Sequence, residues 1–202
     1  MHGLISRSFE DFVKSAYGPG VWRHAMIALD AGLDGFETML HYDDALVDRV
    51  VTLCSAQLGK PREALLEDFG THLVAGEGAA RVRRLLRFGG VDYGDFLHSL
   101  DELAGRAALA VPDIDLPEME LLRVSDAHYE LVCRSGFRGV GFVIMGLLRA
   151  LADDYGALAM LDHLGLRDRC EVISILLLES DFAEGRGFDL APSAVGAGGA
   201  AR

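Results

Sequence analysis

The side chains in this sequence that could hold a ligand or carry chemistry are its cysteines, histidines and arginines. The three cysteines, Cys54, Cys133 and Cys170, lie far apart and show neither metal-ligand spacing nor a disulfide framework. We expect them to behave as small buried hydrophobic residues, as free cysteines usually do. The sequence shows no pairing of a nucleophile with a base, no glycine-rich phosphate loop and no metal-ligand cluster, so we expect no enzyme.

Two histidines, His72 and His98, are the weak candidates for a metal ligand. His98 lies in segment 95–109, which predicts an amphipathic helix because its apolar residues recur at the spacing of one helical face: Phe96, Leu97, Leu100, Leu103, Ala104, Ala107 and Ala108. Ala104 sits in the middle of this stripe, where its larger neighbours predict another bulky side chain. His98 lies about 120° around the helix axis from Ala104 and therefore belongs to the polar face.

Three further histidines fall in predicted loops or turns, where we expect them to face water: His41, His128 and His163.

Composition limits the classes of partner. The chain has 202 residues, of which 50% are hydrophobic and 25% charged, as in an ordinary globular protein. Its formal net charge of -12 would repel a phosphate backbone, so we expect no nucleic acid partner. No apolar run approaches the ~20 residues of a membrane span, and the charged first residues do not resemble a signal peptide. We therefore expect no membrane partner and a cytoplasmic location.

The order of the predicted elements indicates an α+β protein. Glycine and proline positions separate helices near 9–16, 21–31, 43–58, 61–69, 82–86 and 95–109. After residue 112, two predicted hairpins, with strands at 119–124 and 129–133 and at 157–161 and 170–178, flank an apolar helix at 142–151. We interpret 1–182 as one domain, with a helical lobe at 1–60 and an α+β lobe with a small antiparallel sheet at 61–182. The tail, 183–202, is expected to be disordered.

With this layout the sequence resembles the H-NOX family, the haem-based nitric oxide and oxygen sensing domains. The resemblance runs from Met1 to about Leu178, and its length suits a divergent stand-alone bacterial member. The motifs that carry it, specific in this order and spacing, are Met1-His2-Gly3-Leu4-Ile5, Tyr17-Gly18 with Trp22, Tyr42-Asp43-Asp44, Phe69-Gly70, Phe96-Leu97 with Leu100-Asp101, Leu116-Pro117 and Gly146-Leu147-Leu148.

Two departures from the family pattern concern the haem itself. In the family, the histidine that ligates haem iron follows the segment matched here by residues 96–103, and this sequence has Ala104 at that position. A methyl group cannot donate to iron, for which the family uses neutral imidazole. The Tyr-x-Ser-x-Arg motif that holds the haem propionates is also incomplete. One register matches it to Cys133, Ser135 and Phe137, and a shorter one to Arg134, Gly136 and Arg138.

The resemblance implies a pocket between the two lobes. Its expected lining residues are Ile5, His72, Leu100, Ala104, Pro117, Cys133, Arg134, Ser135, Arg138 and Leu147. Ile5 and Pro117 match positions that press on the haem, Leu147 and His72 match its distal side, and Arg134 or Arg138 could offer charge to a carboxylate.

The function implied is that of a sensory or regulatory domain. In the leading interpretation it binds haem, or a related apolar ligand with carboxylates, and takes part in nitric oxide or oxygen signalling with axial ligation that is non-standard or absent. In the alternative it is a haem-free interaction module that regulates a kinase or a cyclase. Both interpretations include a signalling protein as a partner in trans.

Overall fold

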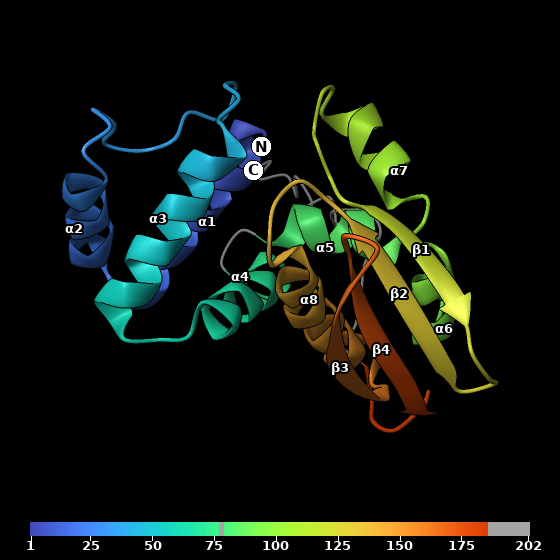
Figure 1. The fold of residues 1–202 in the computed structure, drawn as a ribbon. Helices are drawn as coiled ribbons and strands as arrows, with labels where there is room; N and C mark the ends of the chain where they lie inside the picture. Colours follow the sequence, from blue (N-terminus) through green and yellow to red (C-terminus); the bar gives the residue numbers. More distant parts are fainter. Residues whose placement is uncertain (77–78, 186–202) are drawn as a thin grey trace, which may run out of the picture.

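Two hydrophobic cores organise the chain in the computed structural model, which describes residues 1–76 and 79–185 (Figure 1). Its elements, in chain order, are α1 (Gly3–Tyr17), α2 (Pro19–Leu29), α3 (Asp44–Leu58), α4 (Arg62–Ala75), α5 (Ala80–Arg87), α6 (Tyr93–His98), α7 (Leu103–Ala110), β1 (Glu118–Arg123), β2 (His128–Arg134), α8 (Val140–Tyr155), β3 (Leu158–Arg167) and β4 (Cys170–Glu179). The strands form one antiparallel sheet in the order β1-β2-β4-β3. The predicted α+β class is confirmed.

The first core belongs to α1–α4. Side chains from these helices, among them Phe9, Phe12, Trp22, Val50 and Phe69, are 0–4% exposed. Local signals fix where the helices start: the carboxylate of Asp43 accepts a hydrogen bond from the amide of Ala45 at 2.8 Å and caps α3. Figure 1 shows α1, α2 and α3 side by side at one end of the molecule.

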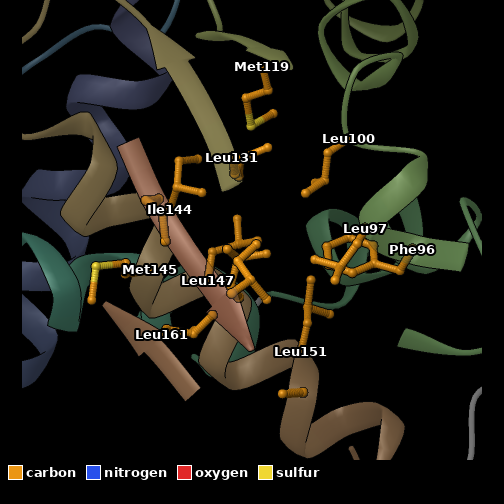
Figure 2. Packing of buried hydrophobic residues seen from close by; sticks show 14 of the residues in the cluster. Phe96, Leu97, Leu100, Met119, Leu131, Ile144, Met145, Leu147, Leu151 and Leu161 are labelled. Carbon is orange, nitrogen blue, oxygen red and sulfur yellow. The ribbon is translucent and has the colours of Figure 1, made fainter. Parts of the chain in front are cut away.

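The second core lies between the sheet and helices α6, α7 and α8, and Figure 2 shows part of it. Tyr93, Phe96 and Leu97 of α6 are completely buried, as are Leu131 of β2 and Ile173 of β4. No helix in the described residues is long and apolar enough to cross a membrane.

Helices α4 and α8 lie between the two cores and cross at unusually close range (Figure 1). A Cβ atom on Gly70 would overlap the carbonyl oxygen of Val143, and one on Gly146 would overlap the carbonyl oxygen of Glu67. The hydroxyl of Thr71 also donates to the carbonyl of Gly146 at 3.3 Å. Glycine at both positions is therefore required by the approach of the two backbones.

The predicted helix 95–109 is wrong as a single helix. The structure divides it into α6 and α7, with a turn at 99–102. The guanidinium of Arg106 donates to the carbonyl oxygen and the hydroxyl of Ser99, at 3.0 and 3.2 Å, and so satisfies groups at the end of α6. As a result Ala104 is half-buried, and Ala108, predicted to face the core, is exposed.

The second hairpin is longer than predicted. The strand expected at 157–161 continues as β3 to Arg167, with a register shift between His163 and Gly165. The glycine takes a positive φ of 89° at this irregularity. Of the tail expected to be disordered, residues 186–202 lie outside the described part of the chain, and the amide of Ala183 donates to the carbonyl of Gly156 at 3.0 Å.

Replacing Gly146 with alanine is expected to destabilise the fold by about 3 kcal/mol or more, because the overlap is with backbone atoms that cannot rotate away. Urea unfolding measures the change. Gly105→Ala is the matched control: a Cβ there meets nothing within 4 Å, so helix propensity predicts an unchanged or higher stability. Equal effects of the two substitutions would contradict the close crossing.

Candidate functional site

Ala104 lies on α7, between the buried residues Leu103 and Ala107. Its own side chain is half-buried and offers no donor atom. The residues of α7 contain no histidine, cysteine or carboxylate, so this helix cannot supply an axial ligand to iron. The position that sequence analysis singled out is therefore half-buried and carries no group that could ligate a metal.

The part of the second core that contains Leu100, four residues before Ala104, is shielded from solvent. Leu100 is 1% exposed, and Leu147, on α8, is 6% exposed. In Figure 2, Leu97 and Leu100 lie on one side of this core, and Leu131, Ile144 and Leu147 lie on the other. Leu100 and Leu147, two of the ten predicted pocket residues, thus belong to one hydrophobic core cluster.

Ile5 and Pro117, two of the predicted pocket residues, come from segments far apart in the sequence. Ile5 is half-buried near the start of α1, and Pro117 is half-buried immediately before β1. The loops beside them meet in one polar contact, where Nε2 of His41 lies 3.3 Å from the carbonyl oxygen of Asp113. His41 is exposed, as expected.

The two histidine candidates lie in different surroundings. His72, on α4, is half-buried with its ring centroid 5.2 Å from that of Phe12. Desolvation by burial lowers the pKa of His72, and the negative charge of Asp11, which raises it, only partly offsets this effect. The neutral form of the imidazole is therefore favoured. His98 is exposed on α6, with its ring edge-on to Tyr129 at 5.6 Å. Among the described residues, no three histidine, cysteine or acidic side chains gather to hold a metal ion.

Cys133 and Arg134 lie on opposite faces of β2. Cys133 is 1% exposed in the core, and burial raises the pKa of its thiol to about 12. A protonated thiol is a poor metal ligand. Arg134 is exposed and pairs with Glu118 of the neighbouring strand at 3.3 Å. The structure therefore brings Cys133, and not Arg134, to the core side of the strand.

After β2, the remaining candidates leave the core. The hydroxyl of Ser135, an exposed residue, accepts a hydrogen bond from the amide of Phe137 at 3.1 Å. Phe137 is 8% exposed in the core of the helical lobe, with the guanidinium of Arg62 5.5 Å from its ring centroid. Arg138 is exposed, and its carbonyl accepts from Arg62 at 3.0 Å.

Sequence analysis missed a polar cluster at the start of α8. The carboxylate of Glu171 accepts from the amides of Gly139 and Gly141, at 2.6 and 2.9 Å, and lies 3.0 Å from Nε2 of His163. The amide of Gly165 donates to Nδ1 of that histidine, so its proton sits on Nε2 and points to the carboxylate. The cluster borders a cavity of about 170 Å³ that Arg138 also lines.

The expectation that His128 and His163 face water from loops is wrong. Both are half-buried residues of strands, where His128 lies 2.9 Å from the hydroxyl of Ser174 and the His163 ring stacks on Phe142 at 4.2 Å. The loop assignment missed His163 because β3 continues past the predicted strand to Arg167, and it missed His128 because β2 begins one residue before the predicted strand. A larger hollow of about 660 Å³ lies beside α2, next to Trp22. Neither cavity is lined by Ala104.

Comparisons with known proteins agree with this architecture. Residues 2–160 match the family model described as Haem-NO-binding. The soluble guanylate cyclases 89Db and 89Da of Drosophila melanogaster are each 24% identical, over 79% and 77% of this chain. The chain spans about a quarter of the length of these relatives, 24% and 23%.

Solved structures show the same fold. An H-NOX protein from K. algicida has a TM-score of 0.76 at 17% identity, with 89% of this chain and 97% of that chain covered. An H-NOX protein from S. oneidensis, in its Fe(II) state, has a TM-score of 0.74 at 18% identity with the same coverage.

The raised thiol pKa of Cys133 predicts a loss of stability in alkali. Below pH 9.0 the thiol is protonated in both the folded and the unfolded chain; above it, only the unfolded chain releases the proton, up to about pH 12. The unfolding free energy should then fall by about 1.4 kcal/mol per pH unit for this group.

Urea unfolding between pH 8 and pH 11, within about one or two units of the ordinary thiol pKa, measures this slope. Cys133→Ala should flatten it, and Cys54→Ala should do the same, because burial also raises the pKa of Cys54 to about 12. Parallel pH profiles for the wild type and both variants would contradict the assigned burial.

Proposed function

Because the chain belongs to the Haem-NO-binding family, we propose that it is a regulatory domain of the H-NOX type that works without a histidine-tethered haem and passes its signal to a partner protein. The observation that carries the proposal is Ala104 on α7, a helix with no side chain able to ligate iron. We propose no catalytic activity for this chain, because the matched family is that of the sensing domain.

The described residues do not fit a histidine-ligated haem. Ala104 offers no nitrogen, Cys133 carries a protonated thiol and His98 is exposed. The guanidinium of Arg134 lies on the strand face away from the core and pairs with Glu118. Among the described residues, α7 supplies no axial ligand and Arg134 is paired with Glu118, so we assign no step of signalling to iron.

A second candidate function keeps a ligand in the predicted pocket. Ile5, Ala104 and Pro117 are half-buried rather than fully packed, and His72 favours the neutral imidazole that iron would need. These observations support a haem, or a related apolar ligand with carboxylates, held mainly by apolar contact. Sensing of nitric oxide or oxygen belongs to this second candidate.

The partner that we propose is a signalling enzyme such as a histidine kinase or a cyclase, reached in trans. The relatives in Drosophila are soluble guanylate cyclases of which this chain spans only about a quarter, which supports an output outside the residues present here. A cytoplasmic location is part of the same proposal.

An absorption spectrum of the purified protein tests the choice between the two candidates. One equivalent of haemin is added, and the protein is then reduced under nitric oxide. We expect no saturable Soret band, because α7 contains no side chain able to ligate iron. A sharp band that shifts with nitric oxide would contradict the haem-free proposal, and substitution of His72, His98 and Cys133 would then identify the ligand.

Ala104→His is the matched variant for this experiment. A Soret band in the variant alone would assign the loss of haem to the missing imidazole. Without a band in either protein, the loss would be assigned to the closely covered core around Leu100 and Leu147, 1% and 6% exposed.

A further inference from the structure

Helix α5 presents two arginines and a phenylalanine on its outward side. Arg81, Arg84 and Phe88 are spaced i, i+3 and i+7, which places them along one side of a helix. Arg81 and Arg84 are exposed, and Phe88, at the end of the helix, is 73% exposed. We refer to these three residues as the α5 stripe.

The opposite side of α5 is held against the rest of the protein. Leu86 is 2% exposed, and the guanidinium of Arg83 pairs with the buried carboxylate of Asp154. Arg87 donates to the carbonyl of Asp154 at 2.9 Å and lies over the ring of Tyr155 at 4.1 Å. The inner arginines therefore serve the fold, and the outer ones do not.

Within the described residues, no acidic side chain forms an ion pair with the outer arginines. In the described part of the chain, the ion pairs involve neither Arg81 nor Arg84, and α5 itself contains no acidic residue. This cationic stripe occurs in a chain of formal net charge -12. Arginine and exposed aromatic side chains are also the residue types enriched at the centres of protein interfaces.

We propose that the α5 stripe is a docking surface for an acidic segment of a partner protein, whose carboxylates meet Arg81 and Arg84 and whose apolar side chain covers Phe88. The inference rests on the proposed function, because it names the surface through which that partner is reached. Charge complementarity carries it: the chain as a whole repels an acidic protein, and the stripe attracts one at a defined place.

Other occupants fit the stripe less well. Stable attraction to anionic lipid takes a cluster of about four to eight basic residues, and the stripe has two. The net charge of -12 opposes a nucleic acid.

The test uses the full chain and a fluorescein-labelled helical peptide of glutamate and leucine. We expect saturable binding, measured by fluorescence anisotropy, that weakens about tenfold or more in the double variant Arg81→Glu/Arg84→Glu. Phe88→Ala should also weaken binding, and added salt should weaken it less in the double variant than in the wild type. Arg23→Glu, an exposed arginine on α2, is the control and should bind as the wild type does.

Several results would overturn the inference. If the peptide does not bind, the stripe is excluded as the docking surface. The same conclusion follows if Arg23→Glu weakens binding as much as the double variant does. Binding of the wild type but not the double variant to vesicles of anionic phospholipid, without peptide binding, assigns the stripe to lipid. Self-association that the double variant abolishes in sedimentation assigns it to a second copy. None of these results changes the Soret spectrum, so the proposed function is judged separately.

Discussion

The structure depends on the close crossing of α4 and α8. Gly70 and Gly146 let the two backbones touch, and α4 and α8 between them supply side chains to both hydrophobic cores. Phe142, near the start of α8, packs against both of them. The two lobes are thus joined by a contact that has no room for a side chain, which fixes their relative position more firmly than flexible side chains could.

This constraint does not involve the residue at position 104. The crossing and both cores are built from residues that do not include Ala104. The contacts that hold the two cores together are therefore independent of the side chain at position 104. The second core is formed by buried apolar side chains, among them Leu100 and Leu147, which are 1% and 6% exposed.

In the proposed function no tethered haem conveys the signal, so the partner protein must recognise another feature of the domain. The proposed α5 stripe is such a feature. The inner arginines of α5 contact Asp154 and Tyr155, the last two residues of α8. A protein docked on the outer arginines would therefore bind a helix that is itself held against α8, one of the two helices of the crossing. This arrangement links the proposed surface to the crossing.

The sequence by itself determined the α+β class and most helix and strand positions, because periodicity and caps such as Asp43 are local properties. Only the tertiary structure decided the break at Ser99, the two faces of β2 that separate Cys133 from Arg134, and the contact of His163 with Glu171. It also decided that Arg83 pairs with the buried carboxylate of Asp154. These features depend on groups that are distant in the chain and meet only on folding, which no local pattern encodes.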